Sequence, residues 1–242
     1  AVFFHVRANS DAYYASEIFA PAPAVASLLE EGFDPPSYVI EGAHQRGLQL
    51  HAWVNPYRIG SNLSYRVSGV DYFQKGDKYY YVPTLPGAAV DALISGSYQV
   101  AHANNIVFGV SPSHDYNKTY SQMYADTHKW LAQPGYVDYM CPQIYFGFLH
   151  GSSPFDKMVD QWFALPRASG VQLYVGLAIY KGGIADDTWA GSGRNEWATH
   201  NDIMKRSVEY LRAKKVPGMI FYSYTYFESA REEAENLLPL LR

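Results

Sequence analysis

Residues 137–148 read VDYMCPQIYFGF, a short apolar run of β-forming residues that ends in polar and aromatic side chains. Five other stretches have the same form, and most are separated by segments typical of helices. A buried parallel strand followed by a functional loop is the repeating unit of an α/β barrel, whose active site collects side chains at the carboxyl ends of the strands. The pattern predicts an α/β fold, a TIM-type (β/α)8 barrel. The other stretches are 2–11, 48–58, 106–115, 171–181 and 218–226.

Side chains alternate in character along these runs. In residues 50–55 (LHAWVN), aliphatic side chains hold the even positions, and His, Trp and Asn hold the odd ones. Successive strand side chains point to opposite faces. We expect the aliphatic face to pack under helices and the other face to become polar towards the mouth of the barrel. On that inner face, His5 and His51 are expected to be buried and hydrogen-bonded rather than catalytic.

Start and stop signals predict the helices between the strands. Asp34–Pro35 and Ser153–Pro154 are typical of helix starts, and Gly47 of a helix end. Two long loops are expected, at 65–86 and 182–199. Without a repeat or a linker, the sequence predicts one domain over residues 1–242. The expected helices are 35–46, 88–104, 120–131, 155–163, 201–214 and 228–241.

Composition excludes several functional classes. The net charge of −4 without a Lys/Arg cluster argues against a nucleic-acid partner. No apolar run approaches the roughly 18 residues that span a bilayer, and the single Cys141 excludes an intrachain disulfide. No metal-ligand spacing or phosphate-binding loop is present, so no cofactor is expected. The 22 Tyr, 12 Phe and 5 Trp suit carbohydrate binding, although core filling is the alternative. The oligomeric state stays open.

Several motifs resemble a known family. FFHVRANSDAYY (3–14), LHAWVNPYRI (50–59), FGVSPS (108–113), VDYMCPQIYFGF and YVGLAIYK (174–181) are similar, in the same order, to the family-ten-like glycosyl hydrolase domain of bacteria. The resemblance implies an α/β barrel that hydrolyses a polysaccharide, with peptidoglycan glycan strands as one substrate. It also implies a location outside the cytoplasm, secreted, periplasmic or lipid-anchored, although the chain shows no targeting segment.

Two strands of that family are not legible in this sequence. Members usually have one more strand before the first one here, and an Asp-rich strand resembling VDGIHFDDYFYP before the helix expected at 88–104. Here PTLPG (83–87) leads directly into that helix, so the second gap falls near Gly87 and Ala88. We interpret this gap as an omitted segment rather than a natural contraction, because a barrel without two strands exposes edges and core.

Glycoside hydrolysis normally uses two carboxylates. Asp11 follows the first strand and shares its face with Arg7, which would keep it ionised as a base; an Asx turn is the alternative. Asp115 follows the third strand and is the second catalytic candidate. If the Asp-rich strand of the family supplies the acid pair, the main catalytic carboxylates are absent from this chain.

Neutral polar and basic side chains at the strand ends suit a sugar's hydroxyl groups. Lys181 is either a contact to a polar substituent or a solvated lysine. A non-catalytic carbohydrate-binding barrel is the alternative function, since acids are few, and a polysaccharide lyase or transferase is a weaker one. The predicted substrate-binding residues are Arg7, Asn9, Asn55, Tyr57, Arg58, Ser111, Gln143, Tyr145, Lys181, Tyr222 and Tyr224, with Ser113 beside them.

Overall fold

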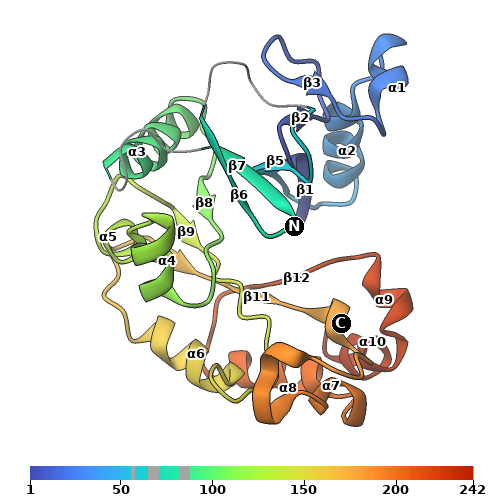
Figure 1. The fold of residues 1–242 in the computed structure, drawn as a ribbon, viewed down its shortest axis with the longest axis vertical. Helices are drawn as coiled ribbons and strands as arrows, with labels where there is room; N and C mark the ends of the chain where they lie inside the picture. The colour runs from blue at the N-terminus through green and yellow to red at the C-terminus, as the bar shows by residue number, and fades with distance from the viewer. Residues whose placement is uncertain (56–57, 65–70, 82–87, 242) are drawn as a thin grey trace. The chain divides into compact units, whose positions relative to one another are not determined.

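The computed structural model describes residues 1–55, 58–64, 71–81 and 88–241 (Figure 1). They form two compact units, Ala1–Thr84 and Leu85–Arg242, and each is presented by itself. The single domain predicted from the sequence stays a prediction.

The first unit is built on a parallel pair of strands. β1 (Val2–Arg7) pairs with β4 (Leu50–Val54). Two-residue strands β2 (Asp11–Ala12) and β3 (Ala20–Pro21) form a second parallel pair. Helix α2 begins after Asp34, whose carboxylate accepts a hydrogen bond from Ser37 N at 3.4 Å, as the sequence predicts. The helices of this unit are α1 (Ala26–Glu30) and α2 (Pro35–His44).

The prediction that residues 65–86 form a loop is partly wrong. Its described residues contain β6 (Tyr72–Lys75) and β7 (Lys78–Tyr81), which form an antiparallel sheet with β5 (Arg58–Gly60) in the order β5-β7-β6. Gly76 lies at φ +61° in the two-residue turn between β6 and β7. This left-handed conformation suits the right-handed twist of a tight hairpin, and glycine adopts it without strain.

The face expected to pack under helices is not fully covered in this unit. Val54 is 46% exposed and Ala52 is also exposed, whereas His51 and Trp53 on the opposite face are half-buried. A ladder of two strands offers little surface for helices to cover. The alternation in the sequence therefore predicts which side chains share a face, but it does not predict that helices leave part of the aliphatic face exposed.

The described residues of the second unit include five short parallel strands. β8 (Gly109–Val110), β9 (Tyr139–Met140) and β10 (Gln172–Leu173) pair in the order β10-β9-β8, and β11 (Val175–Leu177) pairs with β12 (Met219–Phe221). Isolated parallel bridges join Gln143 to both Ser113 and Gly176. The carboxyl ends of β8, β9, β11 and β12 therefore lie along one edge (Figure 1). Each of the six predicted strand regions contains an observed strand; the closed barrel stays an expectation.

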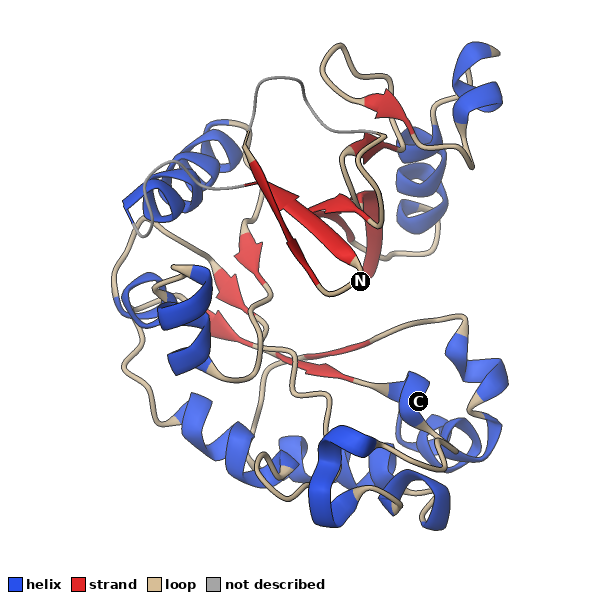
Figure 2. Cartoon of the chain, viewed as in Figure 1, coloured by secondary structure: helices blue, strands red, loops and turns tan. Residues whose placement is uncertain are grey.

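Helices follow the strands of the second unit in turn (Figure 2). The predicted helices at 88–104, 155–163 and 201–214 match α3, α6 and α8, although the N-cap of α6 is Pro154 rather than Ser153. The helices are α3 (Ala88–Ala103), α4 (Tyr116–Met123), α5 (Thr127–Ala132), α6 (Phe155–Phe163), α7 (Glu196–Thr199), α8 (Ile203–Ala213), α9 (Tyr226–Ser229) and α10 (Arg231–Leu237), with 3-10 turns at Ile179–Lys181, Thr188–Gly193 and Leu238–Leu241.

Two predicted helices are each divided. The one expected at 120–131 is α4 and α5, because Tyr124 adopts a left-handed conformation (φ 55°) and Asp126 caps a new helix by accepting from Lys129 N. The one expected at 228–241 is α9 and α10, because Ala230 lies outside the helical region. The loop expected at 182–199 contains a 3-10 turn and α7.

Large aromatic side chains fill the core of the second unit. Trp130, Trp162, Trp197 and Phe155 are almost completely buried. Trp162 also donates a hydrogen bond from Nε1 to His114 O at 2.7 Å, which satisfies its buried polar group. The core therefore anchors the segment that follows β8.

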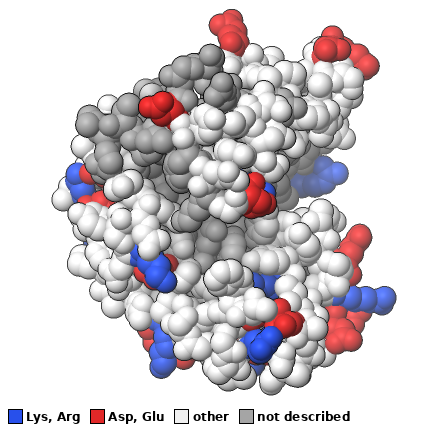
Figure 3. Space-filling model, in the orientation of Figure 1, with Lys and Arg blue, Asp and Glu red and all other residues white. Residues whose placement is uncertain are grey.

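The surface carries mixed charge. On the face drawn in Figure 3, basic side chains lie singly or beside acidic ones rather than in one continuous patch. Among the described residues, no helix combines the length and hydropathy that a bilayer crossing demands. The described part of the chain also holds no group of three His, Cys, Asp or Glu side chains arranged as metal ligands.

Replacement of Trp162 by Ala should lower the free energy of unfolding by about 3–5 kcal/mol, because the change leaves a large cavity and an unpaired His114 carbonyl. Urea denaturation measures the effect. Trp189, which is 87% exposed, is the matched control; Trp189→Ala should change the free energy by less than about 0.5 kcal/mol. Equal effects of the two substitutions would contradict this description of the core.

Candidate functional site

In the first unit, Asn55 ties the ends of β1 and β4 together. Its Nδ2 donates to Ala8 O at 3.0 Å and lies 3.3 Å from His5 Nε2, while its Oδ1 accepts from Trp53 Nε1 at 3.2 Å. Arg7 Nη1 donates to Asn55 O at 3.1 Å. Both polar atoms of the Asn55 side-chain amide, which the sequence predicts to bind substrate, thus have partners within the protein.

Arg7 does not pair with Asp11 as the sequence suggests. Among the described residues no ion pair joins them, and the guanidinium of Arg7 lies 4.1 Å from the centre of the Phe19 ring. Asp11 is buried, and its Oδ1 has no hydrogen-bond partner in the described part of the chain. A buried carboxylate oxygen without a partner is costly, which is a reason to keep Asp11 as a functional candidate.

Other predicted residues of this unit lie near the same strand ends. Arg58 is half-buried in β5, and its charge adds to the effect of burial in lowering the pKa of His5. Asn9 lies against Gly60, where an added Cβ would approach its side chain to 3.8 Å. His5 is half-buried and contacts Asn55, in agreement with the expected structural role. Tyr57 lies outside the described residues.

In the second unit, Ser111 and Gln143 meet at the ends of β8 and β9. Ser111 Oγ donates to Cys141 O at 2.8 Å, and Gln143 Nε2 donates to Ser111 O at 3.2 Å. Ser113 Oγ lies 3.4 Å from His114 Nδ1. The structure therefore brings together these predicted polar residues.

Four tyrosines gather beside Gln143 along the same edge, and we call them the tyrosine cluster: Tyr145, Tyr180, Tyr222 and Tyr226. The rings of Tyr145 and Tyr222 stack at 6.2 Å, and Tyr180 lies edge-on to them at 6.0 and 6.1 Å. Tyr180 contacts Tyr226 at 5.8 Å. Burial raises the pKa of Tyr145 and of Tyr180, so both phenols keep their protons to a higher pH than an exposed tyrosine does.

Tyr224 does not belong to this cluster, although the sequence predicts it on the same face as Tyr222. Its side chain is 87% exposed and contacts only Phe227, at 6.5 Å, among ring contacts of the described residues. The strand β12 ends at Phe221, so the alternation of faces does not continue to Tyr224. Sequence reasoning missed Tyr180, which lies in the turn after β11.

Lys181 forms a buried ion pair with Asp187. The Nζ–Oδ2 distance is 2.5 Å, and the side chains are 11% and 7% exposed. The ammonium also lies 5.5 Å from the centre of the Phe146 ring. The alternative of a solvated lysine is therefore wrong. Sequence reasoning missed Asp187, although its position in a Gly-rich loop after β11 could have indicated it.

Glu196 fastens the loop after β11 to the loop after β9. Its carboxylate accepts from Phe148 N at 2.9 Å and from Leu149 N at 2.8 Å, and the residue is 3% exposed. Gly147 makes room for this contact, because an added Cβ would lie 2.0 Å from Glu196 Oε2. The carboxylate is thus used to hold the loop.

Asp115 caps helix α4. Its Oδ1 accepts from Lys118 N at 3.0 Å, and its Oδ2 lies 3.4 Å from Lys118 Nζ. Burial alone would raise the pKa of Asp115, but the hydrogen bonds and charge of Lys118 outweigh it and hold that pKa below its ordinary value. This geometry favours a structural role; the catalytic role stays a prediction.

Gly147→Ala should disrupt the Glu196 contact, because the new methyl group occupies the place of the carboxylate. We expect the free energy of unfolding to fall by about 2–4 kcal/mol and the loop at 182–199 to become sensitive to proteases. Gly96→Ala, in helix α3 with no atom within 4 Å of the new Cβ, is the control and should stabilise by up to about 1 kcal/mol. Unchanged stability of Gly147→Ala would contradict the role of Glu196.

Stability should fall on acidification through the titration of His150. Burial and then the charge of Lys181 lower its pKa, against the opposite effect of Asp187 and Glu196, and Nδ1 accepts from Ser153 N at 3.0 Å. The unfolded state therefore binds more protons as the pH falls through about 6.5.

His150→Asn keeps an acceptor for Ser153 N but does not titrate. Its free energy of unfolding should depend less on pH between 7 and 5 than that of the parent, as urea titrations at each pH can measure. The exposed His200→Asn is the control and should keep the parent slope. If the stability of His150→Asn depends on pH as strongly as that of the parent, protonation of His150 does not cause the loss of stability.

Comparison with known proteins agrees with the motifs. The model of the family described as glycosyl hydrolase-like 10 matches residues 93–190. The chain is 25% identical to glycosyl hydrolase DigH of Escherichia coli K12 and 24% identical to glycosyl hydrolase YngK of Bacillus subtilis 168. Each match covers 75% of this chain, and 62% and 52% of the two relatives, so the chain spans little more than half their length. No solved structure matches it.

The alignment with DigH has more positions than this chain has residues, 275 against 242. It includes 75% of the chain, about 180 residues, so about 90 aligned positions have no counterpart here. This difference is in keeping with a segment that the relatives have and this chain lacks. The chain is similar to the glycosyl hydrolase-like 10 family, and the resemblance predicted from its motifs is confirmed.

Proposed function

We propose that this chain belongs to a glycoside hydrolase that binds a polysaccharide at the carboxyl ends of its parallel strands. The observation that carries the proposal is the tyrosine cluster beside Ser111 and Gln143 on one sheet edge. Flat aromatic rings pack against sugar rings, while hydroxyl and amide groups exchange hydrogen bonds with sugar hydroxyls. The comparisons support a hydrolase-like function at the level of the family.

The finer parts of the proposal rest on the resemblance. The strands belong to a TIM-type (β/α)8 barrel, in which one further strand lies before Val2 and a second, Asp-rich strand belongs near Gly87 and Ala88. The substrate class is a polysaccharide, with peptidoglycan glycan strands as the first to test, and the protein acts outside the cytoplasm.

Asp11 is the proposed base. Its buried Oδ1 has no partner among the described residues, whereas Asp115, Asp187 and Glu196 are each engaged by Lys118, by Lys181 or by backbone amides. A second carboxylate, acting as general acid, would come from the Asp-rich strand. In that account a chain without the strand binds glycans but hydrolyses them poorly.

The same engagement of the acids favours a second candidate function. A non-catalytic carbohydrate-binding module needs the tyrosine cluster and the amides but no free carboxylate pair. It differs from the hydrolase in one measurable respect, since it binds glycans without forming new reducing ends.

The test incubates the protein, with the Asp-rich strand verified to be present, with peptidoglycan glycans and a panel of polysaccharides and measures new reducing ends. We expect cleavage of at least one glycan, and Asp11→Asn should lower kcat by about 100-fold or more, because an amide cannot act as a base. Asp77→Asn is the control, since Asp77 is 82% exposed in the same unit; it should leave kcat unchanged. Binding without cleavage across the panel would replace the hydrolase by the binding module. Full activity of Asp11→Asn would remove Asp11 from the mechanism.

A further inference from the structure

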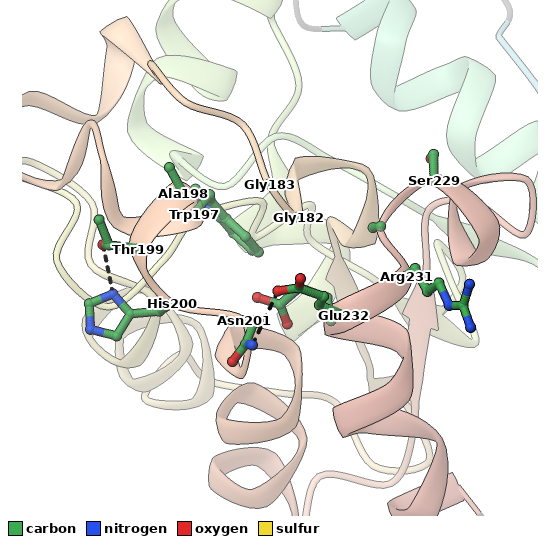
Figure 4. Close-up of a pocket in the computed structure, with 12 residues that line it drawn as sticks. Gly182, Gly183, Trp197, Ala198, Thr199, His200, Asn201, Ser229, Arg231 and Glu232 are labelled. Carbon is green, nitrogen blue, oxygen red and sulfur yellow. Dashed lines mark hydrogen bonds between the residues drawn. The ribbon is translucent and has the colours of Figure 1, made fainter.

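A polar pocket lies between the segments that follow β11 and β12. Its volume is about 470 Å³, within the usual range for small-ligand sites. Three parts of the second unit line it: the turn at Gly182 and Gly183, the end of α7 with the following residues up to Asn201, and the start of α10 (Figure 4). None of its residues is among the predicted site residues.

The pocket adjoins the tyrosine cluster on both sides along the chain. Tyr180 precedes Gly182 by two residues, and Tyr226 precedes Ser229 by three. The rings of Tyr180 and Tyr226 contact each other at 5.8 Å. The turn at Ile179–Lys181 and helix α9, which hold these two tyrosines, therefore lead directly into two walls of the pocket.

The walls of the pocket offer groups that suit sugar hydroxyls. Asn201 Nδ2 donates to Glu232 Oε2 at 3.2 Å across the pocket, and Thr199 Oγ1 lies 3.0 Å from His200 Nδ1 (Figure 4). All four residues are at the surface or close to it. Carboxylate, amide and hydroxyl groups together accept and donate, as neutral sugars require.

The floor of the pocket is preorganised. Glu233 is 2% exposed, and its carboxylate accepts from Ile203 N at 3.1 Å and Met204 N at 2.9 Å at the start of α8. Gly182 packs closely here, because an added Cβ would lie 2.8 Å from Ala230 Cβ. Because these residues are already held in place, ligand binding does not incur the entropy cost of ordering them, which favours affinity.

The charge of the pocket selects against acidic sugars. Glu232 is an exposed carboxylate in the lining, and Arg231, the cation of the lining, pairs with Glu235 at 2.8 Å. The local balance is therefore negative, and a carboxylate-bearing sugar would be repelled. An uncharged sugar meets no such penalty.

We infer that this pocket is a subsite for one neutral sugar unit of the glycan whose neighbouring units lie on the tyrosine cluster. The inference rests on the proposed function and adds to it the kind of unit and where it binds. It predicts that affinity increases with the length of a neutral oligosaccharide, because only a long one reaches both places.

The experiment measures binding by calorimetry with a neutral disaccharide, a neutral hexasaccharide and an acidic hexasaccharide. The neutral hexasaccharide should bind most tightly. Glu232→Ala should weaken its binding about tenfold, as for a lost hydrogen bond to a charged group, and leave the disaccharide unaffected. Ser229→Trp, which fills the pocket without removing a polar contact of the walls, should have the same effect.

Glu209→Ala on helix α8 removes the same charge outside the pocket and is the control. If Glu232→Ala and Ser229→Trp bind the neutral hexasaccharide as the parent does, the subsite is wrong while the proposed function stands. Equal affinity for the acidic hexasaccharide would also overturn it. If the parent binds no oligosaccharide of any length, the proposed function itself fails.

Discussion

The parallel pairing of β8, β9, β11 and β12 is the constraint on which the candidate site in the second unit depends. Parallel strands in register end at the same edge of a sheet, so residues far apart in the sequence meet there. Ser111 meets Gln143, and Tyr145 meets Tyr222, for this reason. The chemistry of the edge then depends on which side chains follow each strand, and here these are phenols, amides and hydroxyls rather than free acids.

A second layer of contacts fastens the loops above that edge. Glu196 binds the backbone of Phe148 and Leu149, and the buried pair of Lys181 and Asp187 closes the segment after β11. Acids in such positions cannot easily serve as catalysts, because protonation or movement would release the loop. The proposed glycan site therefore lies beside acids, Asp187 and Glu196, that have structural roles.

Much of this arrangement follows from the sequence, because strand signals are local. Each of the six predicted strand regions contains a strand, and the polar residues after the strands lead to Ser111 and Gln143. The alternation of side chains between the two faces ends with the strand, so Tyr224, which follows β12, is exposed to solvent. Tyr180, which lies in the turn after β11, joins the cluster instead. Glu196 escapes prediction because its partners, Phe148 and Leu149, lie in another loop, and the Gly147 contact depends on tertiary packing alone. The closed barrel and the catalytic acids stay predictions.

The most direct measurement of the central claim uses ¹⁹F NMR of the protein labelled with 3-fluorotyrosine, with signals assigned by single Tyr→Phe substitutions. On titration with a neutral oligosaccharide, the signals of Tyr145, Tyr180 and Tyr222 should shift together with one dissociation constant. The signal of Tyr120, which is 61% exposed on helix α4, should not move. Shifts confined to tyrosines outside the cluster, or saturation of binding with the cluster signals unmoved, would contradict a glycan site at the strand ends.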